Sequence, residues 1–298
     1  PHLFVPEAGS GNFLKKLKSE IPYFLDLGVN ILHLLPILKS SGDEGFAVDD
    51  YRKTNPYLGT IKDFELFVRT AHEKGIKIVL DFVLNHTSDN HRWAIEAKKK
   101  NPYFKDFYIF SPSDKKPNWP KAPDIFPEHS PGWWDYVPQL NRWVFSTFYK
   151  RRPNKEKREN FNFAQWDLNY QNPEVFFQML ENLLFLANKG VDIFRLDAVP
   201  FIWKEKNTSC QSLRGVHFLL KLFKAGLKEV APRTIFLAEA CQQPSELLKY
   251  FGQEKIEMAY HFPLMQNFWY AIASGKTSQL KKVISSTFKL PPSSQWLI

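Results

Sequence analysis

The sequence has few cysteines and no long apolar run. Its 298 residues include only two cysteines, Cys210 and Cys241. Two cysteines cannot build a disulfide framework, and no C-x-x-C metal or redox spacing occurs. The longest apolar stretch, near VNILHLLPIL, is too short and too broken to span a membrane. These absences argue against a disulfide-rich secreted module and a membrane protein, and with no signal-peptide pattern they favour a cytoplasmic location.

The net charge of +9 raises the question of nucleic-acid binding. Much of the positive charge lies in KRRPNKEKRE at 150–159, with further lysines at 98–100. No recognisable DNA- or RNA-binding motif accompanies either run. We therefore expect solvated surface and no nucleic-acid partner. The alternative, binding through the basic runs, predicts retention on nucleic acid that falls steeply with salt.

Short apolar strands alternate with amphipathic helices along most of the chain, the pattern of βα units around a parallel sheet. Helices are expected at 12–27, 61–74, 173–189 and 213–230, with further helical segments up to about 287. The expected strands are VNILHLLP, IKIVLDFVLNH, GVDIFRLDAV, TIFLAEA, KIEMAYHF and the final QWLI. This series predicts an α/β fold, a (β/α)8 TIM barrel that lacks its last unit. A doubly wound open sheet is the alternative, although no Gly-rich phosphate loop marks its first turn.

The regular pattern stops between residues 101 and 164. This stretch is rich in proline, tryptophan and tyrosine, has no clear period, and is too long for an ordinary loop. We predict a small irregular subdomain at 101–164, inserted after the third barrel strand, with the barrel formed by 1–100 and 165–298.

Polar residues end three of the predicted strands. Arg195 and Asp197 are two positions apart in GVDIFRLDAV, so their side chains face the same way. A structural ion pair would explain these two alone. The earlier strand ends with Asp81, Asn85 and His86, and the later one with Glu239, so three strand ends converge on one barrel mouth; this convergence favours an active site.

Two carboxyls beside one cavity are what glycoside cleavage requires. Arg195 favours the ionised form of Asp197, which fits a nucleophile, whereas Glu239 follows an apolar strand with no cation next to it in sequence. We therefore expect Glu239 to have the raised pKa and to act as the acid/base. If the fold brings the two carboxyls within about 5–5.5 Å, the reaction retains configuration.

The segments DFVLNH, GVDIFRLDAV and FLAEA resemble the first three conserved regions of the α-amylase family of retaining glycosidases and transglycosidases, in the family's order. The resemblance implies a (β/α)8 barrel with an inserted subdomain, Asp197 as nucleophile and Glu239 as acid/base. It also implies that Arg195 and His86 hold the sugar and the nucleophile. Asp81 and Asn85 would be architectural, although Asn85 matches a calcium ligand of some members. No organic cofactor is implied, and no metal is firmly predicted.

Within the family, QWDLNYQNPEV, LFLANKGVDIFRLDAV and FIWKEKNTSCQSL resemble amylosucrases. GDEGFAVDDYR is similar to the segment in which that branch places a stacking aromatic and a pocket-closing aspartate, here Phe46 and Asp43. Phe148 in FSTF is expected to form a second aromatic wall, and ordinary core packing is the alternative for both phenylalanines. FLAEACQQPSELLKYFG and MAYHFPLMQNFWYAI are closer to trehalose synthases.

The family's fourth conserved region, a His-Asp pair after the seventh strand, does not occur before the sequence ends at SSQWLI. The resemblance therefore implies a truncated chain. The expected function is cleavage or transfer of α-glucosyl units from sucrose, trehalose or α-glucans. A non-catalytic binding or assembly module is the alternative. Hydrolysis, polymer synthesis, phosphorolysis and isomerisation stay open, because they differ in what removes the sugar from Asp197.

Overall fold

The computed structural model describes residues 12–128, 132–150, 163–252, 254–287 and 290–297. Its main sheet has six parallel strands in the order β1-β4-β9-β10-β11-β12. These strands are β1 (Ile31–Leu34), β4 (Lys77–Val83), β9 (Ile193–Asp197), β10 (Ile235–Ala238), β11 (Met258–Tyr260) and β12 (Gln295–Leu297). Their order in space follows the chain without reversal. That order confirms the incomplete (β/α)8 barrel and excludes the doubly wound sheet, in which the strand order reverses.

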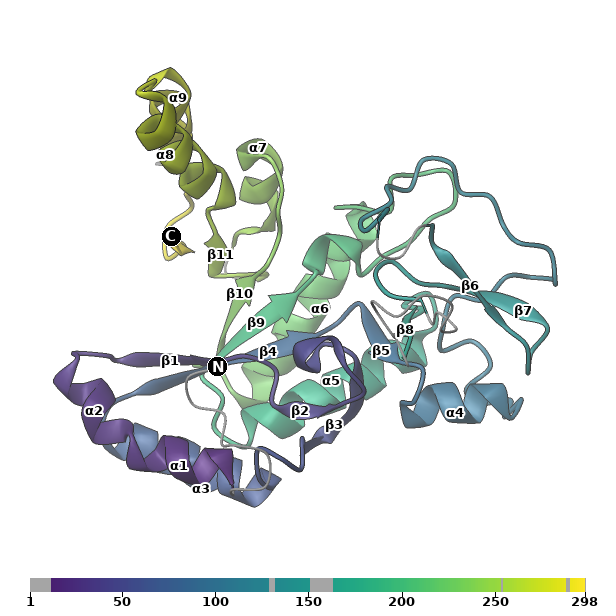
Figure 1. Cartoon of the computed structure of the whole chain (residues 1–298), viewed down its shortest axis with the longest axis horizontal. Helices are drawn as coiled ribbons and strands as arrows, with labels where there is room; N and C mark the ends of the chain where they lie inside the picture. The colour runs from purple at the N-terminus through teal and green to yellow at the C-terminus, as the bar shows by residue number, and fades with distance from the viewer. Residues whose placement is uncertain (1–11, 129–131, 151–162, 253, 288–289, 298) are drawn as a thin grey trace.

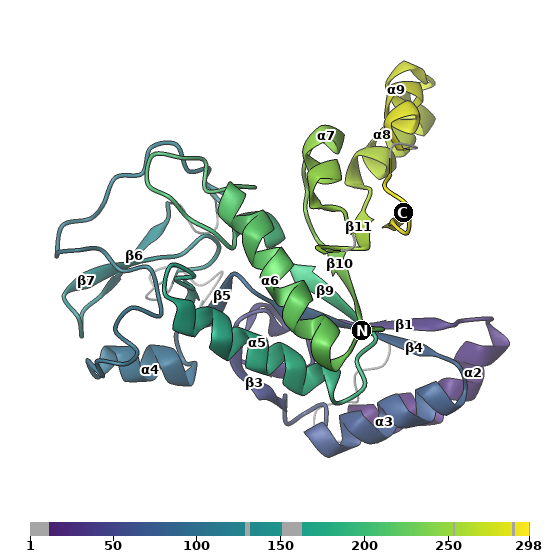
Figure 2. The ribbon, with the colours of Figure 1, turned by 180° about the vertical axis from the view of Figure 1, so that it is seen from behind.

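Helices connect the strands and cover the outer side of the sheet, as Figure 1 and the opposite view in Figure 2 show for α3, α5 and α6. The helices are α1 (Phe13–Ser19), α2 (Ile21–Asp26), α3 (Ile61–Glu73), α4 (Arg92–Lys98), α5 (Pro173–Ala187), α6 (Arg214–Val230), α7 (Pro244–Leu247), α8 (Phe262–Ser274) and α9 (Ser278–Thr287). Short 3-10 turns are η1 (Asp43–Gly45), η2 (Val199–Phe201) and η3 (Leu248–Tyr250). None of the helices in the described ranges is long and apolar enough to cross a bilayer.

The helix predicted over 12–27 is wrong as a single element. The chain forms α1 and α2 instead, and Glu20 ends the first helix and precedes the second. Pro22 explains the break, because proline has no backbone N–H to continue an α-helix and is tolerated only in a first turn. It lies in the first turn of α2.

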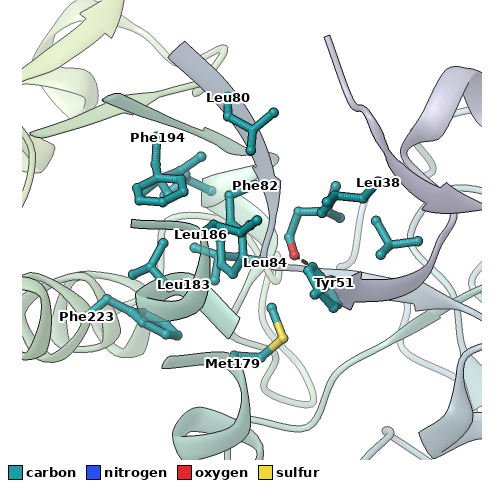
Figure 3. Close-up of a cluster of buried hydrophobic side chains, with 14 of the residues drawn as sticks. Leu38, Tyr51, Leu80, Phe82, Leu84, Met179, Leu183, Leu186, Phe194 and Phe223 are labelled. Carbon is teal, nitrogen blue, oxygen red and sulfur yellow. Dashed lines mark hydrogen bonds between the residues drawn. The ribbon is translucent and has the colours of Figure 1, made fainter. Parts of the chain in front are cut away.

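The hydrophobic core lies between the sheet and its covering helices. Figure 3 shows Phe82 of β4 and Phe194 of β9 facing side chains of α5 and α6. The Phe82 and Phe194 rings meet edge to face with centroids 5.7 Å apart. The other labelled members of this cluster include Leu80, Met179, Leu183, Leu186 and Phe223. Alternation along β9 therefore directs Phe194 and Leu196 to the core and leaves Arg195 and Asp197 for the barrel interior.

Irregular structure follows β4 on the side of the molecule opposite α8 and α9 (Figures 1 and 2). β5 (His86–Ser88) pairs with β8 (Gln165–Asp167), and β6 (Trp134–Val137) with β7 (Arg142–Phe145). A third antiparallel pair is formed by β2 (Leu38–Ser40) and β3 (Val48–Thr54). The described part of 101–164 contains no helix, and the subdomain boundary stays a prediction. Residues 151–159 of the basic run lie outside the described residues.

Candidate active site

The inward face of the sheet has two layers. Val79, Ile193 and Leu237 come from three neighbouring strands and form a buried apolar layer. The next inward position on β4 is Asp81 and on β9 is Arg195, and these two are register partners. Asp197 and Glu239 follow on the same face. The apolar layer thus lies deeper on the inward face, and the charged groups lie at the carboxyl ends of the strands, where barrel active sites occur.

Arg195 joins all three carboxylates of this charged layer. Its Nη1 lies 2.5 Å from Asp81 Oδ1 and 2.8 Å from Asp197 Oδ1, and its Nη2 lies 3.7 Å from Glu239 Oε2. The predicted neighbourhood of Arg195, Asp197 and Glu239 is therefore present in the structure. Because one guanidinium faces three carboxylates, none of the three has a cation of its own among the described residues.

The structure overturns the expectation that Arg195 keeps the pKa of Asp197 low. Burial, together with the charges of Glu239 and Asp81, raises the pKa of Asp197 to about 7 against the opposing effect of Arg195. Desolvation of a carboxylate outweighs its one shared cation here. Asp197 therefore ionises near neutrality.

Glu239 is more exposed than Asp197: its side chain is 29% exposed, against 12%. Its Oε2 accepts a hydrogen bond of 2.9 Å from the backbone N–H of Ala198, the residue after Asp197. No cation is adjacent to Glu239 in sequence, but Arg195 reaches it from the neighbouring strand. The fold thus places both carboxyls around one guanidinium.

His86 is buried on β5, and burial lowers its pKa to about 4, so the ring is neutral at pH 7. Its Nδ1 lies 3.2 Å from Asn85 Nδ2, and its buried Nε2 makes no hydrogen bond within the described residues. The ring of Phe148 meets it edge to face at 5.4 Å. His86 and Phe148, each expected separately to bind the sugar, are therefore in contact, and His86 Nε2 has no hydrogen-bond partner among the described residues.

Asp43 and Phe46 lie in and after η1. Asp43 accepts a hydrogen bond of 2.7 Å from Gln165 Nε2, and burial raises its pKa. Gln165 Oε1 is buried and has no hydrogen-bond partner within the described residues. The Phe46 ring centroid lies 5.6 Å from Arg195 Cζ, within cation–π range. Phe46 thus borders the charged layer, while Asp43 is bound to Gln165 of β8.

The oxygen atoms around Asn85 do not form a site for a calcium ion. Asn85 Oδ1 accepts a 2.6 Å hydrogen bond from Nζ of the buried Lys204. The same ammonium lies 2.6 Å from Asp167 Oδ2 and also donates to the Phe201 carbonyl. A protein cation therefore already neutralises these oxygen atoms. Across the described residues, no group of three or more His, Cys, Asp or Glu side chains could hold a metal ion.

Four further residues of this region were not predicted from the sequence. His33 on β1 lies 2.9 Å from Asp81 Oδ2, and Tyr260 on β11 has its ring 6.0 Å from Arg195 Cζ. Both break an otherwise apolar strand, which was a usable signal. Lys204 and Asp167 lie in irregular or short segments, and no local pattern indicates that they meet.

The chain matches the family profile described as "Alpha amylase, catalytic domain" over residues 7–295. It is 33% identical to the trehalose synthase/amylase TreS of Mycolicibacterium smegmatis over 95% of this chain and 46% of that protein. It is also 33% identical to the trehalose synthase of Thermus thermophilus, over 97% of this chain and 29% of that protein. The chain thus spans half or less of the length of these curated relatives.

Solved structures of similar proteins can also be superposed on this chain. A "Family GH13_31 enzyme" superposes with a TM-score of 0.78 at 28% identity, covering 97% of this chain and 55% of that one. The α-amylase from H. orenii superposes with a TM-score of 0.78 at 25% identity, covering 97% and 56%. The trehalose-synthase-like segments agree with the first two relatives, and the narrower amylosucrase resemblance stays a prediction. The family profile, these relatives and the position of the charged layer together show that the chain belongs to the α-amylase family.

Proposed function

We propose that this catalytic domain cleaves or transfers α-glucosyl units by a retaining double displacement. The observation that carries the proposal is the position of Asp197 and Glu239 around the single guanidinium of Arg195 at the carboxyl ends of two adjacent strands. Paired carboxyls at a sugar cleft are the groups that glycoside cleavage uses.

In the first step Asp197 attacks the anomeric carbon while Glu239 gives its proton to the leaving glycosidic oxygen. The carbon–oxygen bond of the donor breaks and a glucosyl ester of Asp197 forms. Glu239, now a carboxylate, takes a proton from water or an acceptor hydroxyl, which then displaces Asp197. Arg195 orients Asp197 throughout, through the 2.8 Å contact.

Buried polar atoms without a hydrogen-bond partner indicate which residues would bind the substrate. His86 Nε2 and Gln165 Oε1 are buried without hydrogen-bond partners in the described ranges, and a sugar hydroxyl would satisfy each of them. Phe46 and Phe148 offer aromatic faces beside them. We propose sucrose, trehalose or an α-glucan as donor, and the names of the related trehalose synthases favour trehalose. A cytoplasmic location, no organic cofactor and no nucleic-acid partner belong to the same proposal.

A fluorinated α-glucosyl fluoride that traps the ester tests this function. Intact mass should increase by one fluoroglucosyl unit, and the labelling rate should rise with pH through about 7 as Asp197 ionises. Asp197→Asn should take no label. Asp192→Asn, which removes a carboxylate just before the same strand, should label at the parent rate. A folded parent chain that takes no label would contradict the proposal.

A further inference from the structure

Asp81 has hydrogen-bond contacts with two side chains, His33 and Arg195, and Arg195 also binds Asp197. Its side chain is fully buried, so each of its oxygens requires a donor. Arg195 Nη1 supplies Oδ1, and His33 Nε2, 2.9 Å away, supplies Oδ2. Because a carboxylate only accepts, Nε2 must carry the proton.

The same Nη1 of Arg195 also holds Asp197. It therefore divides its contacts between Asp81 Oδ1 and Asp197 Oδ1. A guanidinium prefers to bind one carboxylate with two parallel hydrogen bonds. If Asp81 Oδ2 lost its own donor, this preference would draw Arg195 onto both oxygens of Asp81 and away from Asp197.

His33 is well placed to prevent that rearrangement. It is on β1, at the edge of the sheet, and its side chain is 33% exposed. It lines a cavity of about 700 Å³ between the sheet and α1 and α2. The groups facing Asp81 from the packed strands are His33 of β1, Arg195 and Asp197 of β9 and Tyr260 of β11. Glu239, after β10, reaches the same guanidinium of Arg195.

We propose that His33 is a positioning residue for the nucleophile: by occupying Asp81 Oδ2 it leaves Arg195 free to orient Asp197. The inference rests on the proposed function, since it assigns His33 to the same site. His33 touches no reacting atom and acts only through Asp81 and Arg195.

Two variants test the N–H donor of His33 separately from its imidazole ring. His33→Leu removes the donor, whereas His33→Gln keeps a side-chain N–H near the position of Nε2. His72→Leu is the matched control, because His72 makes a similar pair with Asp192 (2.6 Å, side chain 34% exposed) outside the site. Circular dichroism checks folding of each variant, and His33→Phe serves as a second donor-free variant if His33→Leu does not fold.

The first readout is the rate of labelling by the fluoroglucosyl donor. We expect His33→Leu to label about tenfold to a hundredfold more slowly, the size of effect that small misplacements of catalytic groups produce. His33→Gln should stay within about threefold of the parent, which is the rescue that a positioning role predicts. His72→Leu should label at the parent rate.

The second readout does not need activity. A ¹³C NMR titration of the Asp197 carboxyl, assigned by its loss in Asp197→Asn, should give a higher apparent pKa in His33→Leu than in the parent, because Arg195 then stabilises that carboxylate less. Equal values in the two proteins, or an equal change in His72→Leu, would overturn the inference. A parent chain that fails to label while the titration still shifts would instead count against the proposed function alone.

Discussion

Asp197 and Lys204 are buried charged residues whose partners differ in number. Asp197 competes with two other carboxylates for one guanidinium, and burial raises its pKa to about 7. Lys204 has three oxygen partners of its own, from Asn85, Asp167 and Phe201. A buried charge stabilises a fold only when its partners compensate for desolvation. We therefore expect opposite effects when these two charges are removed.

Removing the Asp197 charge should stabilise the protein at high pH. The folded-state pKa of about 7 exceeds the ordinary value of 3.8, so the folded protein keeps a proton that the unfolded chain loses. Stability contributed by that proton is complete below about pH 4 and is lost as the pH rises to 7. Asp197→Asn should therefore gain stability over the parent between pH 4 and 8, by at most about 4 kcal/mol at 1.36 kcal/mol per pKa unit.

Urea unfolding at pH 4, 6 and 8 measures this difference. Asp192→Asn, outside the site, controls for the loss of a carboxylate as such. A stability difference between Asp197→Asn and the parent that stays constant across the three pH values would contradict the folded-state pKa.

Removing the Lys204 charge should destabilise the protein. Lys204→Met leaves the buried Asp167 carboxylate without its cation, a change that costs about 3–5 kcal/mol in buried pairs. The second substitution Asp167→Asn should recover part of that loss, because it removes the uncompensated charge. Urea unfolding of the two single variants and the double variant measures the coupling.

Lys189→Met is the matched control for Lys204→Met. Its ammonium pairs at 3.0 Å with Glu65, whose side chain is 51% exposed, so its loss should cost about 1 kcal/mol or less. Similar losses for the two lysines would show that the Lys204 pair is not effectively buried.

At the scale of elements, the features that could be predicted from the sequence are those that depend on residues close together in the chain. Periodicity located α3, α5 and α6, and alternation correctly placed Arg195 and Asp197 on one face. The failure at 12–27 came from giving apolar periodicity more weight than Pro22. His33 could not be connected to Asp81 in advance, because their pairing depends on the register between β1 and β4. The meeting of Lys204 with Asn85 and Asp167 depends on tertiary packing in the same way.

The start of α3 provides a prediction at this scale. Thr60 Oγ1 accepts from the Asp63 N–H at 3.2 Å, and Asp63 Oδ2 accepts from the Thr60 N–H at 2.9 Å, which together form a capping box. Thr60→Ala should lower the free energy of unfolding by about 1 kcal/mol. Thr70→Ala, within the same helix, removes only a side-chain bond to Leu66 O and should change stability by about 0.5 kcal/mol or less. Equal losses in urea unfolding would exclude a specific contribution from the cap.

For the whole molecule, the main sheet is open, and apolar surface lies near both of its edges. β1 and β12 each pair with one strand only within the described residues, so the sheet has two edges. The apolar cavity of about 700 Å³ lies beside β1. Near the other edge, Figure 1 shows α8 and α9 projecting from the barrel, and α8 has no buried residue. Its exposed apolar side chains are Met265, Phe268, Trp269, Tyr270 and Ile272.

Exposed apolar groups concentrated on one helix promote association more than the same groups scattered singly. We therefore expect the 298-residue chain to self-associate, and Trp269→Glu to weaken that association about tenfold, equivalent to 1.4 kcal/mol. Phe218→Glu is the matched control, because Phe218 on α6 is 59% exposed against 63% for Trp269 and lies outside this cluster. Size-exclusion chromatography with light scattering over a range of concentrations measures the association. An equal effect of both substitutions would mean that added negative charge, and not the apolar face of α8, controls association.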